Sequence, residues 1–331
     1  MRTRATLKHI SESLNISIST VSRALKNHPD ISAETKKKVN ELASILEYEP
    51  NTHAINLRTN KTKVFGLMVP MSNYFYHSFI AAVESEARKF DYSLLILQSG
   101  DDSLTELENL RLCRSNRVAG VFVSIATHTR DIKPFLKMDE YDIPVIFFDK
   151  VPPFEACNKI CLDDKAAAAL AAETIIAKNK KHVLAIFANE DLSITQKRQT
   201  AFINSFVEKG TQIKTDIINV NSAVETEKLV VEYLMNTEKP DTIFAMSDEI
   251  LTGVIKAINK LSLKMPDDIS VISICNDDFL PTLFNPTITY IETSGSELGK
   301  LAFKRMFDLL AGKSFVQELT VPCRLVEGGS I

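Results

Sequence analysis

From residue 64 onward, short apolar runs of strand length alternate with segments of helical periodicity. The runs include VFGLMVP, SLLILQ, IPVIFFD, HVLAIFA and ISVISIC. Runs of this kind predict buried strands of parallel sheets with helices packed on both faces. About ten such strands are too many for one compact sheet, so we predict two doubly wound parallel-sheet subdomains with a cleft between them.

The body is assigned to residues 64–331. We expect the chain to pass from the first subdomain to the second near Asp163, to return near Thr293 and to cross again near Leu319. The first subdomain then comprises residues 64–162 and 293–319, and the second comprises 163–292 and 320–331.

The charges are divided unevenly along the chain. Residues 1–63 contain 11 Lys and Arg against 6 Asp and Glu, whereas the rest contains 28 against 36, for a total of −3. A basic head on an acidic body indicates that the head alone meets a polyanion such as DNA. A solvated charged face is the alternative interpretation.

Three short amphipathic helices are predicted within residues 1–50, with caps at Thr6, Ser17 and Ser32. Asn15 tolerates the left-handed backbone of a tight turn between the first two helices. This all-α head has the helix-turn-helix plan, whose second helix enters the major groove. An ordinary three-helix bundle with a polar face remains the alternative.

The second helix provides the candidate base contacts. Arg23 can reach a guanine edge, Ile18 can touch a thymine methyl group, and Ser19 can hydrogen-bond to a base. Phosphate contacts are expected from Ser17, Thr20, Ser22 and Lys37, the last within the run Lys36–Lys38.

The head contains TVSRAL, ETKKKV, Y-x-PN and an LRT segment before the V-x-G-x-x-V-P strand. With these motifs it resembles, nearly position for position, the LacI/GalR family of bacterial transcription regulators. The resemblance implies a hinge helix in residues 51–63 that begins at Asn51 and folds when two subunits meet on an operator. It also implies that Leu57 wedges between base pairs in the minor groove. For the body it implies the arrangement of periplasmic sugar-binding proteins.

Ligands of open α/β sheets bind beyond the carboxyl ends of the strands, so polar residues there are the effector-site candidates. They are Asn73, Tyr74, Phe75, Asp149, Arg198, Ser247, Asp248, Asn276 and Asp277. Carboxylates, amides and an arginine beside aromatic rings suit a sugar or a similarly polar metabolite. Asp149, Arg198, Asp248 and Asp277 could equally have a structural role. The family resemblance favours an effector contact for the first three.

The sequence lacks the motifs of nucleotide-binding proteins and of metalloenzymes. The sequence contains no GxGxxG, GxxxxGK(S/T) or HExxH motif and no clustered His/Cys ligands, so we expect no cofactor and no metal. Adjacent aspartates such as Asp163-Asp164 are interpreted as helix caps. The five cysteines form no CxxC pair and are expected to be reduced and mostly buried, and the start MRTRATLKHISES has no apolar leader. We therefore predict a cytoplasmic protein with no membrane contact.

The leading hypothesis is a transcription regulator, most simply a repressor, that acts as a homodimer or larger homo-oligomer on a palindromic operator in double-stranded DNA. A carbohydrate effector in the cleft would modulate its affinity for the operator. A sugar-binding transport module is disfavoured by the missing signal peptide and by the helix-turn-helix. An enzyme acting on a sugar or nucleoside in the same cleft is disfavoured because no phosphate loop, metal cluster or Ser/His/Asp arrangement stands out.

Overall fold

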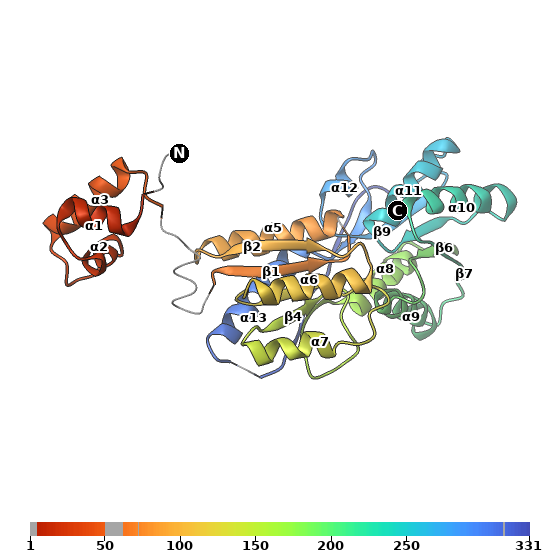
Figure 1. Cartoon of the computed structure of the whole chain (residues 1–331). Helices are drawn as coiled ribbons and strands as arrows, with labels where there is room; N and C mark the ends of the chain where they lie inside the picture. Colours follow the sequence, from red (N-terminus) through yellow and green to blue (C-terminus); the bar gives the residue numbers. More distant parts are fainter. Residues whose placement is uncertain (1–4, 50–61, 72, 314) are drawn as a thin grey trace. The chain divides into compact units, whose positions relative to one another are not determined.

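The computed structural model describes residues 5–49, 62–71, 73–313 and 315–331, which fall into two compact units, Met1–Thr62 and Lys63–Ile331 (Figure 1). The described part of the first unit contains α1 (Leu7–Leu14), α2 (Ile18–Leu25) and α3 (Ala33–Ile45). The predicted hinge helix, with Asn51 and Leu57, lies almost entirely outside the described residues.

The caps and the turn of the head follow the prediction. The side chains of Thr6, Ser17 and Ser32 each accept a hydrogen bond from a backbone N–H of the helix that follows. Asn15 has a φ of 51°, the left-handed turn conformation. A core of five buried residues holds the three helices together: Ile10, Val21, Ala24, Val39 and Ala43.

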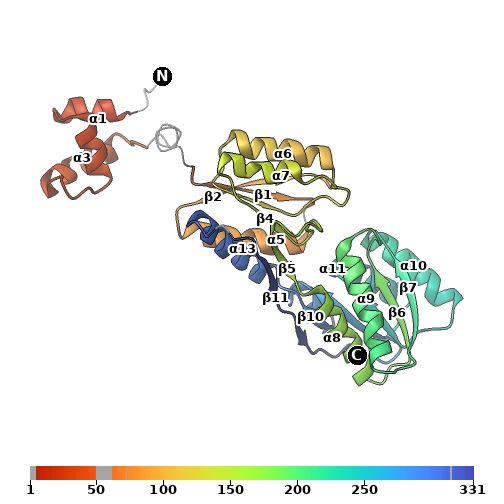
Figure 2. The same cartoon turned by 90° about the horizontal axis from the view of Figure 1, so that it is seen from below.

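The first sheet of the body is parallel, with strand order β11-β5-β4-β3-β1-β2. Its strands are β1 (Val64–Val69), β2 (Ser93–Gln98), β3 (Val121–Val123), β4 (Val145–Phe148), β5 (Asn158–Leu162) and β11 (Glu318–Val321). Helices α5 (Tyr74–Arg88) and α13 (Gly295–Leu310) pack together on one face. Helices α6 (Ser103–Ser115), α7 (Lys133–Leu136) and η1 (Lys137–Tyr141) cover the other face (Figure 2).

The second sheet has the order β12-β10-β9-β8-β6-β7. Its strands are β6 (His182–Phe187), β7 (Lys214–Asn219), β8 (Thr242–Ala245), β9 (Ser270–Cys275), β10 (Thr289–Glu292) and β12 (Arg324–Val326). Its helices are α8 (Asp164–Ala177), α9 (Ser193–Glu208), α10 (Ala223–Asn236), α11 (Asp248–Lys260) and α12 (Phe279–Thr282). The predicted pair of parallel-sheet subdomains is confirmed, except that β12 runs antiparallel to β10.

The chain passes between the sheets after β5, after β10 and between β11 and β12. The third crossing was expected near Leu319, but Thr320 and Val321 still pair with Cys161 and Leu162 of β5. The predicted division after residue 319 therefore cuts through β11 and must move beyond Val321. The sequence signal is weak there because β11 is a short edge strand with half of its side chains exposed.

The GSELG segment (295–299) begins α13 and also sets the distance between α13 and α5. A Cβ on Gly299 would lie 2.7 Å from the carbonyl oxygen of Phe79, closer than real Cβ contacts allow. Glycine at this position therefore lets the two helices approach closely. Among the described residues, no helix is both long and apolar enough to cross a membrane.

Candidate DNA-reading helix and effector site

Helix α2 exposes the predicted base-contacting face. Val21 and Ala24 are buried in the core of the head, while Arg23 and Ser19 are exposed and Ile18 is 48% exposed. At 100° per residue, Ser19 and Arg23 lie on the side of the helix opposite the buried residues, and Ile18 lies at the border between the two sides. The second helix of the motif is thus anchored on one side and presents the other side to a ligand.

Hydroxyl groups gather at the start of α2. The Ser17 hydroxyl lies 2.7 Å from that of Ser19 and 2.8 Å from that of Thr20, and it accepts the Thr20 N–H at 3.0 Å. The N-terminus of a helix favours anions because its N–H groups and its dipole point toward them. This end of α2 therefore fits the predicted phosphate contacts, with half-buried Ser22 one turn further along.

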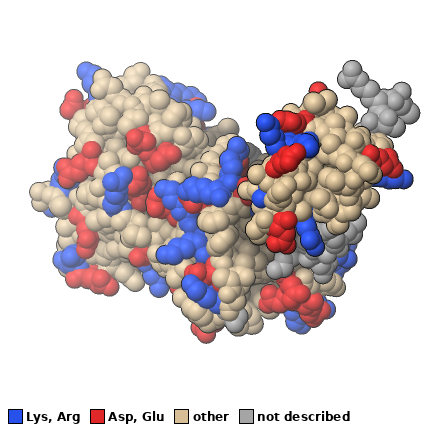
Figure 3. Space-filling model, turned by 90° about the vertical axis from the view of Figure 1, so that its left-hand side faces the viewer, with Lys and Arg blue, Asp and Glu red and all other residues tan. Residues whose placement is uncertain are grey.

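Lys37 lies on α3, where its Nζ is 3.9 Å from Glu41 Oε1 and both side chains are largely exposed. An exposed pair of this kind contributes at most about 1 kcal/mol, so the lysine can exchange its partner for a phosphate. Lys38 pairs with Glu34 in the same way, at 2.7 Å. On the face shown in Figure 3, Lys and Arg are likewise interspersed with Asp and Glu.

In the body, three candidate effector-site residues follow β1. Two of them stabilise the fold, and one is partly exposed. The Asn73 side chain caps α5 by accepting the Tyr76 N–H at 3.0 Å, and Phe75 packs against the core beneath α5. Tyr74 is 39% exposed and stacks on Phe279 of the second subdomain, with 5.0 Å between ring centroids. Tyr74 is therefore the side chain of this group that remains open to a ligand.

Asp149 follows β4 with a left-handed backbone, φ 56°. It accepts a hydrogen bond from the Tyr76 hydroxyl at 2.7 Å, and that hydroxyl also lies 3.0 Å from Ser124 Oγ. Burial raises the pKa of Asp149, while the hydrogen bond from Tyr76 opposes the rise. Sequence reasoning missed Tyr76; its place in the first turn of α5, three residues after the Asn73 cap, is the signal that could have identified it.

Arg198 is 4% exposed and anchors α9 to two other parts of the second subdomain. Its Nε donates to Asp164 Oδ1 at 2.9 Å, and its Nη1 donates to the Met246 carbonyl at 2.6 Å. Of the adjacent aspartates, Asp163 caps α8 as predicted, but Asp164 holds the arginine. A guanidinium has five N–H groups, so the terminal nitrogens keep donors for a ligand.

Ser247 and Asp248 begin α11. The Ser247 hydroxyl caps the helix by accepting the Ile250 N–H at 3.4 Å. Asp248 accepts the Asn276 N–H at 3.0 Å, and burial raises the pKa of Asp248 to about 6. A carboxyl with this pKa changes its charge close to neutral pH.

Asn276 is 2% exposed and joins the subdomains. Its Oδ1 accepts the Ser78 hydroxyl at 3.1 Å and the Gly295 N–H at 2.8 Å, both from the first subdomain. This side chain is occupied by contacts within the protein. Asp277 is half-buried and accepts the Phe279 N–H at 3.0 Å.

The two subdomains bring their strand-end groups within electrostatic reach of one another. Beyond the effect of burial, the pKa of Asp149 responds to the charges of Asp164 and Arg198, which belong to the other subdomain. The pKa of Tyr74 is raised by burial and then by Asp277 and Asp248. Groups of both subdomains therefore lie close enough for their charges to act on one another.

Cys275 ends β9 and directly precedes Asn276. Burial raises the pKa of the Cys275 thiol well above its usual value, so the thiol is a poor nucleophile. Over the described ranges, no group of three or more His, Cys, Asp and Glu side chains is placed to hold a metal ion.

Two protein families match the chain. "Bacterial regulatory proteins, lacI family" matches residues 6–51, and "Periplasmic binding protein-like domain" matches residues 172–331. The HTH-type transcriptional repressor PurR of Vibrio parahaemolyticus is 26% identical over 312 residues, 93% of each chain. The NTD biosynthesis operon regulator NtdR of Bacillus subtilis is 26% identical over 330 residues, 97% of this chain and 98% of its own.

Solved structures share the fold. A lac repressor dimer bound to operator and the anti-inducer ONPF matches with a TM-score of 0.87 and 19% identity over 99% of both chains. A complex of the transcriptional regulator CelR with cellobiose matches with a TM-score of 0.72 and 17% identity over 99% of this chain and 100% of its own. The two family matches account for the head and for much of the body, and the relatives align along nearly the whole chain. The chain belongs to the LacI family of bacterial regulatory proteins.

Proposed function

We propose that this chain is a transcriptional repressor that binds a palindromic operator as a homodimer and responds to a small polar effector, a sugar or sugar derivative. The observation that carries the proposal is helix α2, which is anchored on a three-helix core and exposes Ile18, Ser19 and Arg23. This is the arrangement that inserts side chains into a major groove.

Exposed apolar side chains support the homodimer. Ile96 lies on β2, an edge strand of the first sheet, and is 46% exposed; Leu104 and Leu112 of the neighbouring α6 are 70% and 48% exposed. The second subdomain repeats the pattern at its edge strand β7 and on α10, where Val224 is 72% exposed. Large apolar groups beside open sheet edges favour burial by another chain.

The strand-end groups support a polar effector. Arg198 retains free N–H donors, Asp149 and Asp248 provide carboxylate acceptors, and Tyr74 offers an exposed ring. Donors, acceptors and an aromatic face together suit a sugar ring. Cellobiose and D-xylulofuranose occupy two of the structurally similar proteins, which supports a carbohydrate here.

A regulator of this kind works in the cytoplasm, where the chromosome is, and without turnover of its effector. An enzymatic alternative would require product formation from the bound sugar. A turnover assay on each sugar that binds separates the two functions, because a regulator returns its ligand unchanged.

DNA binding is tested by selecting fragments from a random duplex library with the purified full-length chain. We expect a palindromic consensus and a dimer on the selected DNA. Enrichment without any consensus, or a consensus with no dyad symmetry, would contradict the proposal.

The effector is sought by thermal shift against a sugar library, followed by operator affinity with and without each hit. Asp149→Asn should abolish the response to the effector and leave effector-free operator affinity unchanged. Asp142→Asn is the matched control, because Asp142 is exposed and shares the left-handed backbone with a φ of 57°. A full response in the Asp149 variant would place the effector site elsewhere.

A further inference from the structure

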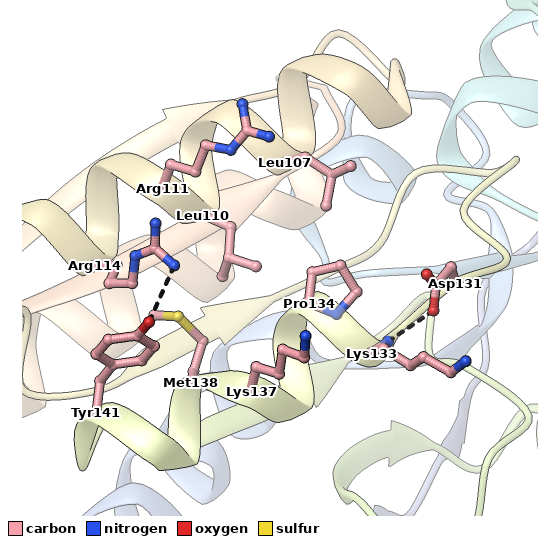
Figure 4. A pocket seen from close by; sticks show the side chains of 10 residues that line it. All are labelled: Leu107, Leu110, Arg111, Arg114, Asp131, Lys133, Pro134, Lys137, Met138 and Tyr141. Atoms are coloured by element: carbon pink, nitrogen blue, oxygen red, sulfur yellow. Dashed lines mark hydrogen bonds between the residues drawn. The ribbon is translucent and has the colours of Figure 1, made fainter.

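A second concave surface lies on the first subdomain, between α6 and the α7–η1 segment (Figure 4). Its volume is about 310 Å³, within the size range of small-ligand pockets. None of its lining residues belongs to the candidate effector site. We refer to it below as the α6–α7 groove.

The floor of the α6–α7 groove is apolar. Leu110 is 4% exposed and Met138 is 2% exposed, and both belong to the core between this face of the sheet and its helices. Half-buried Leu107 and Pro134 continue the apolar surface toward solvent. An apolar group of a ligand resting here would lose its contact with water on one side.

Four cationic side chains edge this floor. Arg111 and Arg114 come from α6, and Lys133 and Lys137 come from α7 and η1, so both sides of the groove contribute cationic residues; in Figure 4 the end groups of Arg114 and Lys137 turn toward the space between the two elements. Asp131 is the single carboxylate of the lining, and its Oδ1 accepts the backbone N–H of Lys133 at 3.0 Å. The groove therefore has a clear excess of positive charge.

These cations differ from those on the opposite face of the same sheet. There Arg88 pairs with Glu84, Lys89 with Glu86 at 2.7 Å and Lys300 with Glu297 at 2.6 Å. Around the groove, by contrast, no carboxylate in the described part of the chain lies within ion-pair distance of any of the four. Arg114 instead lies over the ring of Tyr141, 5.1 Å from its centroid, which holds the guanidinium at the rim.

We propose that the α6–α7 groove is a second ligand site that takes a small organic phosphate: a phosphate monoester whose other end is apolar. The guanidinium groups match phosphate oxygens in pairs, and the lysines add charge that a dianion neutralises. The apolar floor receives the rest of the molecule. Inorganic phosphate can bind the cationic side chains but not the apolar floor, and a neutral ring can bind the floor but not the cations.

The chain contains no tryptophan, which makes a direct assay available. Tyr141 is 51% exposed at the groove, so Tyr141→Trp places a single fluorescent reporter there in the full-length protein. Phenyl phosphate is the probe, and we expect a saturable change in fluorescence. Phe90→Trp is the matched reporter control, because Phe90 is 44% exposed and packs against α13 on the opposite face of the sheet; it should show no saturable change.

Charge reversal tests the cations. Arg111→Glu with Lys137→Glu, in the Tyr141→Trp background, should weaken phenyl phosphate binding roughly ten-fold or more, because charge-assisted hydrogen bonds are lost. Lys239→Glu, an exposed loop lysine of the second subdomain, should leave the affinity unchanged. Calorimetry on the chain with its native Tyr141 should give one site per subunit that the double reversal removes.

Four results would overturn the proposal. The first is a flat titration, and the second is equal affinity in the double variant. The third is inorganic phosphate binding as tightly as phenyl phosphate, which would mean an adventitious ion only. The fourth is phenol or benzoate binding as tightly, which would mean that the phosphate group is not what the site selects.

Discussion

Arg198 is a candidate effector-site residue that forms a buried ion pair with Asp164. Removing Arg198 should leave the Asp164 carboxylate buried and unpaired, so the stability of the Arg198→Ala variant tests this part of the site directly. The two side chains are 5% and 8% exposed, and Nη2 lies 2.9 Å from Oδ1. Breaking a buried pair by deleting one partner costs about 3–5 kcal/mol, because the remaining ion has lost both water and its counter-charge. We expect Arg198→Ala to lower the free energy of unfolding of the body by this amount.

Thermal unfolding measures the effect. A unit as large as Lys63–Ile331 has an unfolding entropy of roughly 0.6 kcal/mol/K, so the loss corresponds to a fall in Tm of about 5–9 °C. Arg198→Met combined with Asp164→Leu should recover most of the stability, because neither charge is then buried alone. The double variant should still fail to respond to the effector, since the donors remain absent.

The same two helices provide the control. Lys209, just after α9, pairs with Glu173 of α8 at 3.1 Å, but these side chains are 56% and 46% exposed. Lys209→Ala should therefore cost less than about 1 kcal/mol, a fall in Tm of about 2 °C or less. Equal falls for Arg198→Ala and Lys209→Ala would refute the reasoning, as would a double variant no more stable than Arg198→Ala alone.

Further predictions concern DNA and pH. Arg23→Ala should reduce discrimination between operator and random DNA by about 1–3 kcal/mol, measured by competition binding; an equal loss on both would make Arg23 a phosphate contact. Lys37→Ala should weaken binding to every sequence and lower the slope of log affinity against log salt by roughly one. Leu57→Ala, outside the described residues, should reduce operator bending in a circular-permutation gel assay, because the predicted wedge is lost. Burial raises the folded-state pKa of Asp248 to about 6, so the folded state holds its proton longer than the unfolded state and stability falls as pH rises from about 4 to 6. Asp248→Asn should remove that part of the decline, seen as a flatter urea-midpoint profile against pH.

The order of strands and helices could be read from the chain because each buried strand is uniformly apolar. Strands β6 and β9 are buried along their whole length, and both were recognised as the runs HVLAIFA and ISVISIC. The late strands β10, β11 and β12 have three or four residues each, and their pairing depends on segments far away in the sequence. Such short strands carry too little periodicity to identify, which is why the antiparallel edge and the end of β11 were missed.

The candidate site was predictable in its residue types and only partly in its contacts. Strand-end polar residues were named because parallel sheets gather them at one edge. Their partners were not, since Tyr76 reaches Asp149 across 73 positions of sequence, and Asn276 reaches Ser78 across 198. No local pattern distinguishes an amide that binds a ligand from one that joins two subdomains.

The sequence by itself determined the head, because its caps and turn depend on contacts only three or four residues apart. Ser17 needs only Thr20 to cap α2, and Asn15 needs only its own backbone preference to make the turn. The tertiary structure alone decided that Asp164 pairs with Arg198 and that α6 meets η1 to form a basic groove. These contacts join separate elements, and their geometry follows from how helices pack on a sheet.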